Sequence, residues 1–222
     1  MDTYSGWARC PGTCGEWIQG AKEGTPFLID CPVDRYVEVE ASLVKVQGGQ
    51  GLTPKRGNWQ LSSQKTKTAK ALNLLAKQFD IQSRGKVNFH SELPVGKGMA
   101  SSTADLSAAM AAVLSSLKIP WTPQDLVRIA LAIEPSDPVM FPGVTEIAHQ
   151  DGKYVRELGN NVPAMLLVLD WGGTLDTQRF NARADLLEHY RRHEALIKKA
   201  LAIFYEGIDR SDLEKMAYAG TI

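Results

Sequence analysis

The chain has 222 residues, and its 25 Lys and Arg residues balance 25 Asp and Glu residues, so the formal net charge at pH 7 is zero. That balance argues against a broad electrostatic grip on nucleic acid or on an anionic membrane. No apolar run approaches the ~20 residues of a membrane-spanning helix, and the N-terminal residues show no signal-peptide pattern. Three cysteines are an odd set in a chain large enough to fold without disulfides, which favours a reduced, cytoplasmic protein.

The first part of the chain is typical of strands and turns. Residues 25–33 and 35–46 are rich in strand-forming residues, and apolar residues alternate with glutamates from Val37 to Ala41, as on a half-buried strand. Residues 47–58 contain turn-forming residues and no apolar period. We therefore expect a surface loop there.

A helix is predicted for residues 66–81, followed by a strand at 86–94. The inward face of the helix is expected to carry Ala71, Leu74, Leu75 and Gln78. The lysines expected in solvent are Lys65, Lys67 and Lys70. The strand leads directly into the segment PVGKGMASSTAD, residues 94–105.

The rest of the chain is mainly helical in pattern. Residues 101–117 are rich in alanine and leucine, and residues 122–134 begin with Thr122 as N-cap, Pro123 at the first helical position and Asp125 in the first turn. The elements expected after these are a hairpin at 145–158, a buried strand at 164–173, a long amphipathic helix at 185–207 and a further helix from 211.

This mixed order of elements fits an α+β fold better than a regular alternation of strands and helices. A second domain is expected to begin near residue 163, which divides the chain into 1–162 and 163–222, with the chain ending inside the second domain. The long helix would expose an apolar stripe unless another surface covers it. We therefore expect either weak or no activity from this chain alone, or a homodimer that covers the stripe. The stripe consists of Leu186, Leu187, Leu196, Leu201 and Phe204.

The segment 94–105 contains a glycine-lysine pair but lacks the common phosphate-loop patterns. Gly98 follows Gly96 and Lys97, and position 91 is serine where the Walker pattern requires glycine. What remains is a strand, a Gly-x-Gly loop and a run of hydroxyls at a helix N-terminus. Free amides and the helix dipole favour an anion there. The alternative is that Ser101 only caps the helix.

Two motifs together resemble a known family. The segments CPGTCGE, residues 10–16, and PVGKGMASSTA, residues 94–104, are similar to the first and second motifs of the GHMP kinases. With LIDCPVDRY, residues 28–36, the combination most resembles the branch that phosphorylates L-threonine in cobalamin biosynthesis. The resemblance runs from residue 8 to about residue 180, and no third glycine-rich motif follows. In the second motif Met99, Ala100 and Thr103 replace the usual leucine, glycine and alanine.

The resemblance implies a GHMP kinase fold, in which 1–162 is an S5-like N-terminal ATP-binding domain and 163–222 an incomplete C-terminal α+β domain. It implies ATP and Mg²⁺ as cofactors, and transfer of the γ-phosphoryl group to the hydroxyl of a small amino-acid alcohol, L-threonine for preference. Acceptors of the homoserine or mevalonate type, and a non-catalytic nucleotide-binding module, are the alternatives.

The resemblance also assigns site residues. The predicted phosphate loop comprises Pro94, Gly96, Lys97, Gly98, Met99, Ala100, Ser101, Ser102 and Thr103. Ser102 and Glu134 are the predicted magnesium ligands, and Asp137 is the predicted catalytic base. The predicted acceptor contacts are Thr13, Cys14 and Glu16.

Each assignment has a structural alternative. Asp137 could bridge within its own turn, and Glu134 could bind a substrate ammonium or only end a helix in solvent. Cys14 could be a small buried hydrophobe, and Lys97 a solvated loop lysine. Some relatives have a catalytic lysine where this chain has Thr13, so a lysine-assisted mechanism does not carry over.

Overall fold

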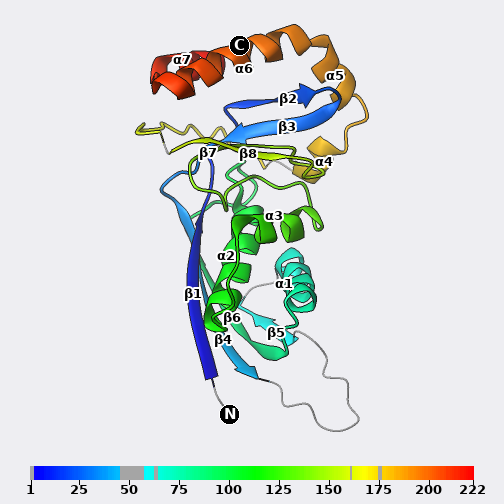
Figure 1. The fold of residues 1–222 in the computed structure, drawn as a ribbon, viewed down its shortest axis with the longest axis vertical. Helices are drawn as coiled ribbons and strands as arrows, with labels where there is room; N and C mark the ends of the chain where they lie inside the picture. The colour runs from blue at the N-terminus through cyan, green and yellow to red at the C-terminus, as the bar shows by residue number, and fades with distance from the viewer. Residues whose placement is uncertain (1–2, 46–57, 63–64, 161, 175–176) are drawn as a thin grey trace.

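The computed structural model describes residues 3–45, 58–62, 65–160, 162–174 and 177–222. It stacks two four-stranded sheets along the long axis of the molecule, each with its own helices (Figure 1). The strands are β1 (Thr3–Pro11), β2 (Ile18–Lys22), β3 (Thr25–Asp30), β4 (Tyr36–Lys45), β5 (Asn58–Leu61), β6 (Ser83–Ser91), β7 (Val144–Ile147) and β8 (Val155–Gly159). The helices are α1 (Thr66–Gln78), α2 (Ser101–Ser116), α3 (Pro123–Leu131), α4 (Thr177–Asn181), α5 (Leu186–Arg192), α6 (Glu194–Arg210) and α7 (Leu213–Ala219).

The first sheet has the strand order β1-β4-β6-β5, and only the β5–β6 pair is parallel. Helix α1 connects these two parallel strands, as such a crossover requires. The alternation along β4 buries Val37, Val39 and Ala41 completely or nearly so. Helix α2 packs across β1 and β4. A Cβ on Gly6 of β1 would lie 2.3 Å from the carbonyl oxygen of Ala112, so the close approach of helix and strand requires glycine.

The predicted helix at 66–81 is confirmed as α1, but its inward face is different from the prediction. Ala71 and Leu75 are buried as expected, whereas Leu74 is 37% exposed. Helix α1 packs against both α2 and α3, and its buried face also includes Thr68, Leu72 and Ala76. Lys65 and Lys67 were expected in solvent, but each pairs with a carboxylate, Asp105 and Glu134 respectively, and the Lys67 side chain stays 41% exposed.

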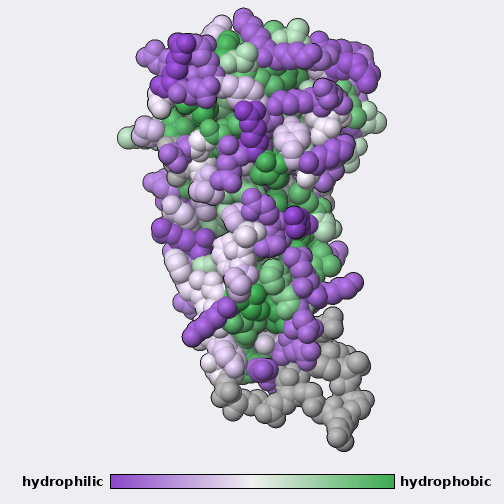
Figure 2. All heavy atoms as spheres, viewed as in Figure 1, coloured by the Kyte–Doolittle hydropathy of each residue, from purple (hydrophilic) through white to green (hydrophobic). Residues whose placement is uncertain are grey.

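The second sheet has the order β2-β3-β7-β8. One face carries Ile18, Phe27 and Ile29, against which α5 and α6 pack. The opposite face packs Leu28 and Ile147 against residues of the α3 region. In Figure 2 the outer side of α6 and α7 is mostly hydrophilic, and hydrophobic side chains show beneath them at the level of the sheet.

The predicted long helix at 185–207 is divided at His193 into α5 and α6. Both helices contact β2. A single straight helix would carry one end past this short sheet, and the change of direction keeps both halves on it. Within the predicted apolar stripe, Leu186, Leu201 and Phe204 are buried against the sheet, whereas Leu187 and Leu196 are about half exposed.

The predicted buried strand at 164–173 is wrong. These residues form no strand, and their apolar side chains are exposed: Met165 is 97%, Leu167 88% and Trp171 91% accessible. A buried strand needs a neighbouring strand to satisfy its backbone groups, and no described strand pairs with this segment. The hairpin at 145–158 is confirmed as β7–β8.

Two further predictions relate to the whole chain. The predicted loop at 47–58 lies outside the described residues, except for Asn58, which begins β5. Helices α5 and α6 pack on a sheet made entirely of residues before 163, and α7 packs against α6. The domain division at 163 stays a prediction. None of the helices in the described part of the chain combines the length and apolar character needed to cross a bilayer.

Candidate functional site

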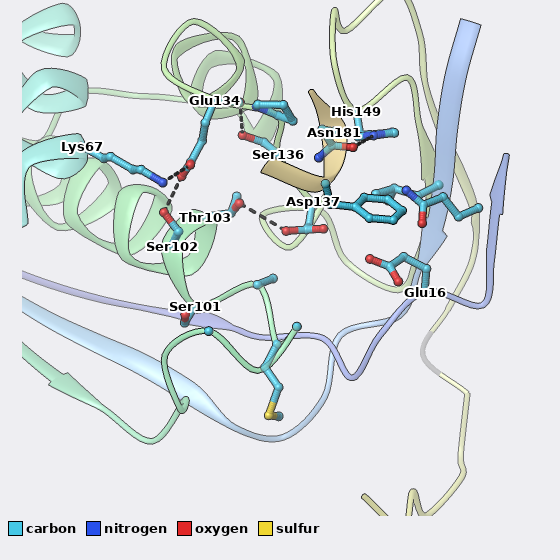
Figure 3. A pocket seen from close by; sticks show the side chains of 18 of the residues that line it. Glu16, Lys67, Ser101, Ser102, Thr103, Glu134, Ser136, Asp137, His149 and Asn181 are labelled. Carbon is cyan, nitrogen blue, oxygen red and sulfur yellow. Dashed lines mark hydrogen bonds and ion pairs between the residues drawn. The ribbon is translucent and has the colours of Figure 1, made fainter. Parts of the chain in front are cut away.

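A cavity of about 450 Å³ lies between the second sheet and the N-terminus of α2 (Figure 3). Its walls come from the β1–β2 loop, the inner faces of β2 and β3, the segment 95–103, the turn after α3, and α4. Seven predicted loop residues line it: Gly96, Gly98, Met99, Ala100, Ser101, Ser102 and Thr103. Glu16, Glu134 and Asp137 line it as well, so the fold brings together most of the site residues predicted from separate parts of the sequence.

The N-terminus of α2 opens onto this cavity. The N-cap residue is Ala100, in the left-handed conformation with φ of 53°, and no side chain caps the helix. The sequence alternative of Ser101 as N-cap is therefore wrong, because Ser101 is already the first helical residue. Backbone amides of the first turn thus keep no side-chain partner and can receive an anion. Left-handed backbone costs a residue with a Cβ about 1 kcal/mol or more, which is a strain typical of functional loops.

The two predicted motifs pack against each other through their backbones. The amide of Thr13 donates to the carbonyl oxygen of Met99 at 3.3 Å, and that of Gly15 to Gly98 at 3.2 Å. A Cβ on Gly12 would lie 2.5 Å from the Met99 oxygen, so glycine is required there. This packing fixes the β1–β2 loop at the edge of the cavity, where Glu16 reaches it.

Four predicted site residues lie elsewhere. Thr13 is 2% exposed beneath the loop. Lys97 points away from the cavity, with its ammonium 2.9 Å from a carboxylate oxygen of Asp170. Cys14 and Pro94 line a second, more open cavity of about 1150 Å³ on the side of residues 162–168.

Ser102 and Glu134 form a pair at the helix N-terminus. The Ser102 hydroxyl donates to Oε1 of Glu134, and the Lys67 ammonium contacts Oε2 of the same carboxylate (Figure 3). Hydroxyl and carboxylate oxygens are ligands that Mg²⁺ accepts, and this ion is usually held by one or two carboxylates together with substrate phosphates. Among the described residues no group of three or more His, Cys, Asp or Glu residues could hold a metal. The pair fits an ion that arrives with a nucleotide.

Asp137 faces this pair across the first turn of α2. The Thr103 hydroxyl donates to Oδ2 of Asp137 at 3.4 Å. Burial raises the pKa of Asp137 to about 7, and the nearby charges of Glu16 and Glu134 add to the effect. A carboxyl group with a pKa near neutrality can accept a proton and release it under physiological conditions.

A buried carboxyl group that the sequence analysis did not single out stands close by. Asp30, at the end of β3, is 1% exposed, and neither carboxyl oxygen has a hydrogen-bond partner among the residues that the structure describes. Burial raises its pKa well above the usual value, with contributions from the charges of Asp137 and Glu16. The signal available in the sequence was a single aspartate ending the apolar strand TPFLID.

Three other lining residues were not anticipated: Lys67, His149 and Asn181. His149 is 2% exposed, and its Nε2 lies 3.3 Å from Oδ1 of Asn181 in α4. Its backbone oxygen accepts from the amide of Ser136 at 2.9 Å, which helps to hold the turn that carries Asp137. No sequence pattern links these positions, because they come from distant elements.

Comparison with known proteins places the chain in a family. Residues 66–141 match the model of the GHMP kinases N terminal domain. The L-threonine kinase of Salmonella typhimurium (strain LT2) is 33% identical over 174 residues, which cover 78% of this chain and 55% of that protein. The chain belongs to the GHMP kinase superfamily. The chain spans just over half the length of the curated relatives that it matches.

Solved structures agree on the GHMP kinase fold. The homoserine kinase from Cytophaga hutchinsonii aligns with 97% of this chain and 71% of its own, with a TM-score of 0.66 at 15% identity. A complex of MDDEF with MVAPP, AMPPCP and magnesium aligns with 99% of this chain and 72% of its own, with a TM-score of 0.62 at 19% identity. The α+β GHMP fold expected from the sequence is thereby confirmed.

Proposed function

We propose that this chain is an ATP-dependent kinase that transfers the γ-phosphoryl group to the hydroxyl of L-threonine, a step of cobalamin biosynthesis. The observation that carries the proposal is one cavity with an uncapped helix N-terminus and the Ser102–Glu134 pair on one side and Asp137 facing them. The sequence identity of 33% and 29% to two L-threonine kinases supports threonine as the acceptor. The fold alone does not distinguish threonine from other acceptors, because solved structures named for different substrates share it.

The α2 N-terminus is the proposed phosphate site. Amides of the first helical turn and the positive end of the helix dipole attract phosphate oxygens. Gly96 and Gly98, both with positive φ, let the loop backbone approach the ligand closely. When bound, Mg²⁺ would be held by Ser102 and Glu134 and would neutralise charge on the phosphates. Lys97 reaches this site only if it leaves Asp170.

Asp137 is the proposed base. It accepts the proton of the threonine hydroxyl as that oxygen attacks the γ-phosphorus, and Thr103 orients its carboxylate. Its pKa of about 7 leaves a large fraction ionised at neutral pH, as proton abstraction requires. Glu16 supplies negative charge on the same side of the cavity, which suits the ammonium of an amino acid. Thr13 and Cys14 would act through the shape of the loop that carries Glu16.

A coupled ADP-release assay with threonine, serine, homoserine and mevalonate tests this proposal. We expect ADP release with threonine at the highest kcat/KM. Release only with homoserine or mevalonate would retain the kinase and reject the acceptor. Binding of MgATP without release from any acceptor would favour a non-catalytic nucleotide-binding module, and absence of MgATP binding would reject the proposed site.

A further inference from the structure

Both carboxylate oxygens of Glu134 are already engaged by side chains of this chain. Ser102 donates to Oε1, and the ammonium of Lys67 contacts Oε2. The Glu134 side chain is only 6% exposed, so its negative charge would be costly without a close cation. Lys67 therefore occupies the position at which a divalent cation would bind Glu134.

Lys67 also differs from the rest of the cavity in charge. The other charged residues that line it, Glu16, Glu134 and Asp137, are acidic. Within the described lining, Lys67 is the one lysine or arginine. A nucleotide polyphosphate carries several negative charges and requires positive charge close to it. Helix α2 and a magnesium ion supply part of that charge, and Lys67 is placed to supply more.

The attachment of Lys67 leaves it free to move. It is the second residue of α1, and its side chain is 41% exposed although its ammonium contacts a buried carboxylate. A long, flexible side chain that is partly exposed can change partner without disturbing the core. Figure 3 shows Lys67, Glu134 and Ser102 in a row beside the first turn of α2, where the phosphates are expected.

We propose that Lys67 is a phosphate-binding residue held on Glu134 until Mg²⁺ takes that carboxylate, and that it then pairs with the polyphosphate. In this exchange each negative group would keep a cationic partner, because the ion would replace the ammonium beside Glu134 and the ammonium would pair with the phosphates. The inference rests on the proposed nucleotide site. It adds a residue that distinguishes ATP and ADP from AMP.

The test is nucleotide binding to the whole chain by isothermal titration calorimetry, with no need for turnover. Lys67→Met should weaken MgATP and MgADP at least about tenfold, the equivalent of 1.4 kcal/mol, and change AMP affinity little. Lys67→Arg should retain most of the affinity. Lys70→Met is the matched control on the same helix, because Lys70 is exposed and does not line the cavity. It should bind all three nucleotides as the wild type does.

The outcomes separate this inference from the proposed function. If the wild type binds MgATP and Lys67→Met binds it equally well, the Lys67–Glu134 pair is only structural and the inference is overturned. An equal loss of MgATP and AMP affinity in Lys67→Met would also overturn it, because a phosphate contact must discriminate between them. Failure of the wild type to bind MgATP would instead reject the nucleotide site itself.

Discussion

At the scale of single residues, Asp137 carries the proposed chemistry. Asp137→Asn retains the size of the side chain but cannot accept a proton. We expect kcat to fall by at least about 100-fold, with MgATP affinity unchanged within twofold, by steady-state kinetics and calorimetry. The control is Asp151→Asn, an exposed carboxylate in the β7–β8 turn. Equal losses of turnover and of MgATP binding would contradict the role as base.

The raised pKa of Asp137 also predicts how stability depends on pH. In the folded state Asp137 holds its proton up to its raised pKa of about 7, whereas in the unfolded state it releases the proton near the ordinary aspartate pKa of 3.8. Between these values the folded protein binds more protons, so the contribution of Asp137 to the free energy of unfolding falls as pH rises. Asp30 acts in the same direction.

Urea unfolding at pH 5 and pH 7.5 measures this effect. The wild type should lose more stability between the two pH values than Asp137→Asn, since the amide does not titrate. If the two proteins show the same change, Asp137 does not hold its proton as described.

The pH dependence of turnover is opposite to that of stability: kcat should rise with pH up to about 7, because the base must be ionised.

The sequence allowed prediction of those site residues that belong to contiguous motifs. Ser102 and Asp137 were predicted as members of short segments with recognisable neighbours, and both line the cavity. Lys67 was predicted to lie in solvent. Its pairing with Glu134 could not be predicted, because the two residues are 67 positions apart in the sequence. Asp30 has no recognisable motif around it. Its burial close to the charges of Asp137 and Glu16 becomes visible only in the folded structure.

At the scale of elements, α3 shows how local signals fix a helix start. The Thr122 hydroxyl accepts from the Asp125 amide, and the Asp125 carboxylate accepts from the Thr122 amide at 2.9 Å. The sequence predicted Thr122 as N-cap, Pro123 at the first helical position and Asp125 in the first turn, and the structure adds the reciprocal hydrogen bonds of a capping box. Thr122→Ala should lower the free energy of unfolding by about 1 kcal/mol, whereas Thr122→Ser should retain most of it. Urea denaturation checks both, and equal stability of Thr122→Ala and the wild type would contradict the cap.

Other elements depend on what packs against them, and there the predictions were incomplete. The periodicity of 185–207 indicated a helix but could not indicate that two short segments must follow one small sheet. The apolar run at 164–173 has the composition of a buried strand, yet a strand exists only with a hydrogen-bonding neighbour. An apolar composition indicates that a segment tends to be buried, but it does not indicate which element would cover it.

At the scale of the whole molecule, the exposed apolar residues of this segment determine how the chain behaves in solution. Met165, Leu167 and Trp171 are each at least 88% exposed, which is unusual for a surface without a binding role. We expect self-association that increases with concentration, measured by analytical ultracentrifugation. Leu167→Asp should reduce it, and the melting temperature should not change because the side chain has little packing to lose. A monomeric wild type at high concentration would contradict this expectation and the predicted homodimer.

The proposed function depends above all on phosphoryl transfer to threonine in the cavity between the second sheet and the N-terminus of α2. The most direct measurement is ³¹P NMR of the chain with MgATP and L-threonine, with Asp137→Asn in parallel. We expect an O-phosphothreonine signal that grows as ATP is converted to ADP, and a much slower growth with Asp137→Asn. Binding of MgATP with no phosphothreonine, or equal rates from both proteins, would contradict this expectation.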